Sequence, residues 1–108
     1  MEDIKYEDFK KMDLRVGKIL EVEEHPNADK LYLVTIDIGE EKRKFVAGIR
    51  PYYQKEELIG KSCVVIVNLE PKNIRGIESH GMVLAALSEG TFGILTIDRQ
   101  IPPGTKIS

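Results

Sequence analysis

The chain has 108 residues, of which 42% are hydrophobic and 31% charged, with a formal net charge of −2. This length fits a single domain, residues 1–108, and the composition excludes a disordered or fibrous protein. No apolar run approaches the roughly 18 residues of a membrane span, and the acidic start MEDIKYEDFKK does not resemble a secretory signal, so we expect a cytoplasmic protein with no membrane partner.

Apolar patterning predicts a mainly β protein. Six runs of alternating or continuous apolar residues are typical of strands: 14–24, 30–39, 42–49, 62–69, 81–87 and 93–97. Between the third and fourth runs the pattern changes, with Pro51 early and Gly60 directly after Ile59. This order predicts a short helix that ends at a glycine.

Gly17 interrupts the first run. A glycine inside a strand usually marks a bulge or sharp bend, so the inward-facing set, expected at Leu14, Val16, Leu20 and Val22, can change phase there. In the second run one face should carry Tyr32, Val34, Ile36 and Ile38.

Three strands, a short helix and two more strands are the order of an OB-fold, a five-stranded Greek-key barrel with its helix between strands 3 and 4. The N-terminal residues and the sixth run are then extensions of the barrel. In this fold the face of strands 2 and 3 and the loops after strands 1 and 4 bind oligonucleotides or oligosaccharides. The second of these loops spans residues 68–80, far longer than a hairpin turn requires, which indicates a role other than turning.

The net charge conceals an uneven distribution. Residues 1–41 carry 6 basic and 12 acidic side chains, a net of −6, whereas residues 42–80 carry 8 basic and 4 acidic ones, a net of +4. A local positive surface can bind an anion on an acidic domain, because charges more than about 8 Å away are largely screened at physiological salt. Simple solvation of the surface explains the same charges equally well.

Nothing in the sequence indicates catalysis, a cofactor or a metal. Cys63 has no partner and lies in a valine run, where a small core residue is expected. The two histidines lack a second cysteine or a close acidic cluster to complete a metal site, and no glycine-rich phosphate loop is present.

Four ordered motifs carry a family resemblance: DLRVGKI, HPNADKL, AGIRPYY and NLEPKNIRGIESHGM. Together they resemble the tRNA-binding domain family, an OB-fold module appended to many methionyl-tRNA synthetases and also found free-standing. The resemblance covers about residues 9–106. It implies a non-catalytic module that binds tRNA by shape, forms homodimers, and works with or as part of a methionyl-tRNA synthetase.

Matched position by position, the resemblance implies nucleic-acid contacts in both loops. Lys72 and Arg75 suit phosphate contacts, because each neutralised phosphate releases counterions and favours binding; the alternative is that they only solvate the loop. The other implied contacts are Asn27, Lys30, Asn68, Ser79 and Met82.

Four of these contacts have explicit structural alternatives. Asn68 and Asn27 suit turns, because asparagine side chains bond nearby backbone, and Ser79 has the same alternative. Met82 opens an apolar strand and could pack in the core. Two other functional classes also stay open: a protein-interaction module, either a dimerisation domain or a chaperone-like binder of unfolded chains, and a general single-strand binder.

Both ends of the chain add apolar residues outside the predicted barrel. Tyr6 and Phe9 lie at positions i and i+3 with Met12 close by, and Ile101 belongs to a second apolar segment. Exposed apolar patches commonly mark an interface, so we expect a homodimer. The alternative is that the two ends cover each other on a monomer.

Overall fold

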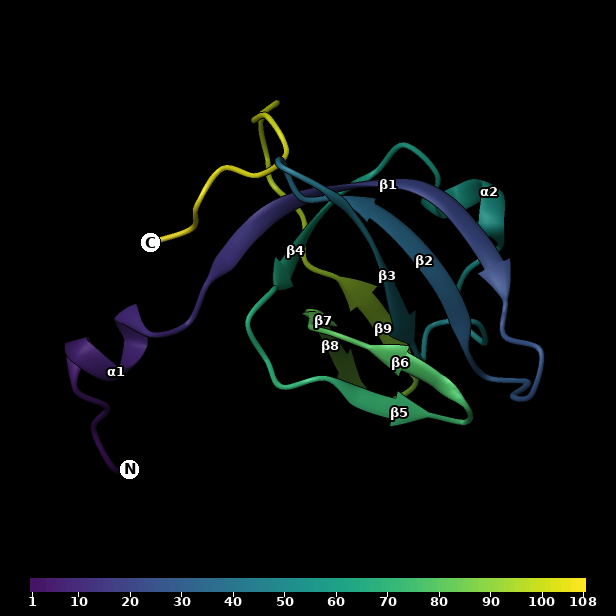
Figure 1. The fold of residues 1–108 in the computed structure, drawn as a ribbon, viewed down its shortest axis with the longest axis horizontal. Helices are drawn as coiled ribbons and strands as arrows, with labels where there is room; N and C mark the ends of the chain where they lie inside the picture. Colours follow the sequence, from purple (N-terminus) through teal and green to yellow (C-terminus); the bar gives the residue numbers. More distant parts are fainter.

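The computed structural model describes residues 1–108, and its main element is a curved antiparallel sheet that closes into a nearly complete barrel (Figure 1). The sheet has the strand order β3-β2-β1-β4-β7. Its strands are β1 (Leu14–Glu24), β2 (Tyr32–Asp37), β3 (Lys42–Ala47), β4 (Ser62–Ile66) and β7 (Met82–Val83). The expected mainly β, OB-like architecture is thus confirmed.

The long strand β1 pairs with two neighbours. Residues 14–18 pair with β4 and residues 18–24 pair with β2, with a register shift between Ile19 and Glu21. On the other side of its first half, the C-terminal segment adds three backbone hydrogen bonds, from Gly104 to Val16, from Val16 to Thr105 and from Ile107 to Leu14. β1 therefore connects the barrel to the C-terminal extension.

The inward face of β1 differs from the expected one. The core contains Ile19 and Val22, whereas Leu14 and Leu20 are only half-buried and Val16 is buried outside the main core cluster. Gly17 explains the difference, because a Cβ atom there would lie 2.6 Å from Cγ2 of Ile36. Gly17 faces the core and leaves room for the side chain of Ile36. The residues expected to face inward before the register shift were therefore the wrong set.

The main core has thirteen buried residues. It contains all four residues expected on one face of the second run, three of them on β2 and Ile38 directly after it, and Phe45 of β3 and Cys63 of β4 are fully buried within it. Burial raises the pKa of the Cys63 thiol to about 12. Cys63 is therefore a core residue, as the sequence predicted.

Two short helices flank the barrel. α2 (Lys55–Leu58) lies between β3 and β4, buries Leu58 completely and is followed by Gly60 at φ +89°, which confirms the predicted helix and its glycine stop. α1 (Tyr6–Lys10) projects away from the barrel (Figure 1). Neither helix has the length and apolar character needed to span a membrane.

Two predicted segments fold differently from expectation. Residues 68–80 contain a β-hairpin, formed by β5 (Lys72–Ile74) and β6 (Ile77–Ser79). The fifth apolar run divides into β7 and β8 (Ala85–Ser88), and β8 pairs with β9 (Thr91–Ile94). β9 begins before the predicted 93–97 because a two-residue turn at Glu89 and Gly90, both with positive φ, fixes its register.

Candidate nucleic-acid interface

The β5–β6 hairpin has a tight two-residue turn. Ile74 pairs with Ile77, which leaves Arg75 and Gly76 in the turn at φ +55° and +95°. Two successive positive φ values define a type I′ turn, whose twist matches that of the strands. The side-chain Oδ1 of Asn73 accepts a 2.9 Å hydrogen bond from the N–H of Gly76. The turn places the exposed Arg75 at the tip of the hairpin.

The loop between β1 and β2 is bonded to this hairpin. His25 is buried; its Nδ1 accepts the N–H of Asn27 at 3.0 Å, and its Nε2 lies 3.0 Å from the carbonyl oxygen of Ile74. The side-chain amide of Asn27 donates to the carbonyl of Arg75 at 3.3 Å. We call these four residues, His25, Asn27, Ile74 and Arg75, the loop clasp. It joins the two predicted binding loops into one surface.

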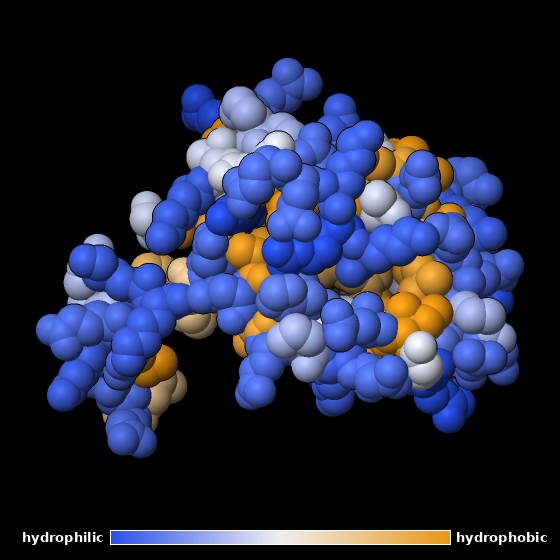
Figure 2. All heavy atoms as spheres, in the orientation of Figure 1, coloured by the Kyte–Doolittle hydropathy of each residue, from blue (hydrophilic) through white to orange (hydrophobic).

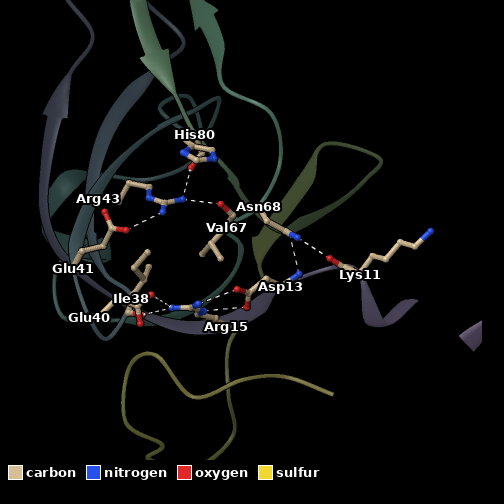
Figure 3. Close-up of polar contacts among 10 residues, drawn as sticks. All are labelled: Lys11, Asp13, Arg15, Ile38, Glu40, Glu41, Arg43, Val67, Asn68 and His80. Carbon is tan, nitrogen blue, oxygen red and sulfur yellow. Dashed lines mark hydrogen bonds and ion pairs between the residues drawn. The ribbon is translucent and has the colours of Figure 1, made fainter. Parts of the chain in front are cut away.

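The base of the hairpin is bonded to the edge of β3. Oγ of Ser79, itself 3% exposed, accepts the N–H of Val46 at 3.0 Å. Nearby, Arg43 donates to the carbonyls of Val67 and His80 at 2.7 and 3.1 Å, as Figure 3 shows. These bonds connect β3 to the segments that follow β4. Ser79 and Arg43 thus close the barrel and hold the hairpin against it.

Beside the hairpin lies a mostly apolar groove of about 480 Å³. It is bounded by the end of β3, the hairpin and strands β7 to β9, and Met82, 48% exposed, lines it together with Leu69 and Phe92. Lys72 and Glu70 are its charged lining residues. The possibility that Met82 is a core residue is therefore excluded. On the face drawn in Figure 2, hydrophobic side chains surface in patches among polar ones, both on the barrel and on the N-terminal projection.

Ion pairs divide the basic residues of the positive segment into two groups. Four are paired with carboxylates: Arg43, Lys44, Arg50 and Lys55. The other four, Lys42, Lys61, Lys72 and Arg75, form no ion pair and are exposed. Of these, Lys72 and Arg75 lie on the hairpin, and Lys30 on the first loop is likewise exposed and without an ion pair. A paired cation must first lose its partner to meet a phosphate, so the free cations of the two loops are the ones suited to that contact.

Asn68 has a different setting. Its Oδ1 accepts the N–H of Asp13 at 2.9 Å and its Nδ2 donates to the carbonyl of Lys11 at 2.6 Å (Figure 3). It therefore joins the end of β4 to the N-terminal segment instead of capping a turn through its own backbone. Its predicted contact with nucleic acid stays a prediction, and the amide would have to give up these bonds to make it.

Sequence reasoning did not identify His25 as part of the site. The residues after it, Pro26, Asn27 and Asp29, are turn formers that explain the loop without it. Its partner Ile74 lies 49 residues away, so no local pattern reveals the contact. Among the predicted contacts, the structure joins Asn27 and Arg75 in the clasp, places Lys72 and Met82 on the adjoining groove, and leaves Lys30 exposed on the first loop.

The predicted interface residues at the chain ends lie outside the core. Tyr6 is 71% exposed and stacks on Phe9 with the ring centroids 6.4 Å apart. Met12 and Ile101 are each 37% exposed. The two ends therefore leave much of their apolar surface open to solvent in a single chain.

Comparison with known proteins gives consistent matches over almost the whole chain. A family model described as "Putative tRNA binding domain" matches residues 14–106. The methionine–tRNA ligase of Pyrococcus horikoshii is 52% identical over 107 residues, which are 99% of this chain and 15% of that protein. The methionine–tRNA ligase of Thermotoga maritima is 52% identical over 105 residues, 97% of this chain and 17% of that protein. The chain thus spans less than a fifth of the length of these relatives.

Solved structures also match, each over the whole of its own chain. A MetRS-related protein from Pyrococcus horikoshii superimposes with a TM-score of 0.92 at 33% identity, covering 100% of both chains. The CsaA chaperone protein of Picrophilus torridus has a TM-score of 0.90 at 38% identity, covering 98% of this chain and 100% of that chain. The same fold therefore occurs in solved chains that it covers completely and, by sequence, as a small part of a ligase.

Proposed function

The chain belongs to the tRNA-binding domain family, and we propose that it binds folded tRNA without catalysing a reaction on it. The observation that carries this proposal is the loop clasp. It joins the two family loops and sets the free cations of the hairpin beside an apolar groove. RNA recognition requires cations that contact phosphates, next to an apolar surface on which unstacked bases can pack.

In this proposal the free cations set the affinity. Lys72 and Arg75 contact phosphates of the tRNA backbone, with Lys30 as a third. Contacts with about three phosphates give a shallow salt dependence, with a slope of roughly −2 to −3 in log affinity against log salt, and an affinity in about the micromolar range. The acidic remainder of the chain repels every polyanion, tRNA included, so charge alone does not select among nucleic acids and discrimination comes from the shape of the bound RNA.

A homodimer forms the second part of the proposal. The exposed apolar residues Tyr6, Met12 and Ile101 supply the surface that a second copy covers. A two-fold pair presents two loop clasps on one particle, which raises avidity if one tRNA reaches both. Sedimentation equilibrium at micromolar concentration should give twice the 12.2 kDa chain mass; a mass near 12.2 kDa contradicts the dimer.

We also propose that the chain works together with a larger enzyme. Its similarity to a small part of methionine–tRNA ligases supports a role with the catalytic part of such an enzyme, either fused to it or bound to it. In that setting the module raises the affinity of the enzyme for tRNA by adding a second contact site. The expected cytoplasmic location belongs to the same proposal.

A chaperone-like binder of unfolded chains is the competing function. The likeness to the CsaA chaperone protein and the apolar groove both favour it. A peptide in the groove and tRNA on the hairpin would use overlapping surface, since Lys72 and Met82 line the groove. A chaperone-like function therefore predicts that an unfolded polypeptide binds at least as tightly as tRNA, and the proposed function predicts that it binds less tightly.

A gel-shift series tests the proposal directly. The chain is titrated against tRNA, duplex DNA, single-stranded RNA and an unfolded polypeptide at roughly 50 and 200 mM salt. We expect tRNA to bind more tightly than the other three, without strong preference for one anticodon. Equal binding to the three nucleic acids, no binding at the lower salt, or tighter binding of the polypeptide would each contradict the proposal.

A further inference from the structure

We infer that His25 is a positioning residue for RNA binding, which acts by holding the β5–β6 hairpin, and with it Arg75, in the binding orientation. The inference rests on the proposed function for its binding part and on the loop clasp alone for its structural part. His25 is 3% exposed and cannot itself reach a bound RNA without leaving its site. Its influence must therefore pass through the groups that it contacts.

The hydrogen bonds of His25 fix its chemical form. Because Nδ1 accepts the N–H of Asn27, the ring proton must reside on Nε2, and Nε2 donates to the carbonyl of Ile74. The neutral imidazole thus uses one nitrogen to organise its own loop and the other to hold the hairpin. No aliphatic or hydroxyl side chain supplies a hydrogen-bond acceptor and a hydrogen-bond donor at the spacing of the two ring nitrogens.

The hairpin needs such support. Its strands are three residues long, and an isolated two-stranded hairpin is marginally stable at best in water. Its turn also holds Arg75 at φ +55°, a conformation that residues with a side chain rarely adopt. The clasp bonds the carbonyls of Ile74 and Arg75, the two residues that enter this turn. It stabilises the turn at the point of greatest strain.

The second hairpin of the molecule provides an internal comparison. β8 and β9 are joined by a turn of the same kind, with Glu89 at φ +48° followed by Gly90. Neither residue of that turn accepts or donates a side-chain hydrogen bond. A loss of the clasp should therefore lower the backbone order of residues 72–79 and leave the backbone order of residues 85–94 unchanged.

The first experiment needs no RNA. Backbone amide NMR order parameters are measured in the wild-type chain and in His25→Phe, which keeps a ring in the buried site and removes both hydrogen bonds. We expect lower order parameters in residues 72–79 of the variant, unchanged values in residues 85–94, and partial rescue in His25→Gln, whose amide can donate to Ile74. Unchanged order in residues 72–79 would overturn the inference.

The second experiment is a double-mutant cycle with tRNA affinity as the readout. His25→Phe should weaken binding about tenfold in the wild-type background. In the Arg75→Ala background the same change should cost less, about threefold, because Lys72 is then the one proposed phosphate contact left on the hairpin. Equal losses in both backgrounds would show that His25 does not act through Arg75.

A replacement variant and the RNA-free measurement cover the two ways in which these experiments can fail. If His25→Phe fails to fold, Asn27→Ala replaces it, since Asn27 is exposed and the change removes only the bond to the carbonyl of Arg75. If the wild-type chain binds no tRNA, the proposed function fails, while the order parameters still decide whether His25 holds the hairpin.

Discussion

His25 and Ile74 lie 49 residues apart in the sequence and are joined by a 3.0 Å hydrogen bond between Nε2 and the carbonyl oxygen. This bond brings the loop after β1 and the hairpin after β4 into a single surface. An OB-fold presents both loops at one end of its barrel, but their relative position is free unless something bonds them. In this chain the relative position is fixed before any ligand binds.

We expect Lys72→Ala and Arg75→Ala to weaken tRNA binding and to reduce the salt slope by about 0.7 to 0.9 each, since each removes one phosphate contact. Neither cation forms an ion pair, so the free energy of unfolding should change by less than about 0.5 kcal/mol. Salt-dependent fluorescence anisotropy checks the slope. Lys18→Ala, another exposed cation without an ion pair, is the control, and an equal effect of that change would assign the slope to net charge alone.

The two type I′ turns allow a matched test of turn strain. Asparagine adopts positive φ more readily than arginine or glutamate, so Arg75→Asn and Glu89→Asn should each raise the free energy of unfolding by about 0.5 to 1 kcal/mol. Only Arg75→Asn should weaken tRNA binding. Urea unfolding and a binding titration of both variants check this. Stabilisation with undiminished binding in Arg75→Asn would remove Arg75 from the interface.

Asn68→Ala should act on the N-terminal segment. The change removes the bonds to the backbone of Asp13 and Lys11, at a cost of about 1 kcal/mol in the free energy of unfolding. Any loss of tRNA affinity should leave the salt slope unchanged, because an amide neutralises no phosphate. A reduced slope would mean that the change displaces one of the cations.

Asp13 should make stability sensitive to acid. Its hydrogen-bonded ion pair with Arg15 holds the pKa of the Asp13 carboxyl below its usual value of 3.8. The carboxylate therefore stabilises the folded chain fully above its unfolded pKa, and this contribution is lost as the pH falls through the lower folded value. Asp13→Asn should lower stability at pH 7 and reduce the loss below about pH 4. Parallel pH profiles of wild type and variant would contradict this role.

Cys63 should be unreactive in the folded chain. Burial raises the pKa of its thiol to about 12, so almost no thiolate exists at neutral pH and the sulfur is also inaccessible. A thiol reagent at about pH 8 should modify the folded chain slowly and the urea-unfolded chain rapidly. Rapid modification of the folded chain would show that β4 opens readily.

The barrel could be predicted because its signals are local. The alternation along β2 and the glycine that ends α2 both lie within a few residues. The phase of β1 could not, because the inward position of Gly17 depends on Ile36 of another strand. The β5–β6 hairpin was expected as a loop because its three-residue strands are too short to show a period.

In the candidate site, too, the residues with a local signal could be predicted and those held by long-range bonds could not. Lys72 and Arg75 could be identified from residue type and from the family resemblance, and the structure adds that both are free of ion pairs. Ser79 and Asn68 were expected to contact nucleic acid, yet their hydrogen-bonding partners, Val46 and the backbone of the N-terminal segment, lie 33 or more residues away. Such long-range bonds leave no trace in a local pattern.

A titration of the chain with tRNA, followed by amide chemical shifts, tests directly whether the two clasped loops form the RNA-binding surface. We expect residues 25–31 and 72–79 to shift together and saturate together, along with the groove residues Met82 and Phe92, while residues 6–10 of α1 stay unchanged. Shifts confined to residues 85–94 or to the N-terminal segment, with the two clasped loops unaffected, would contradict this expectation.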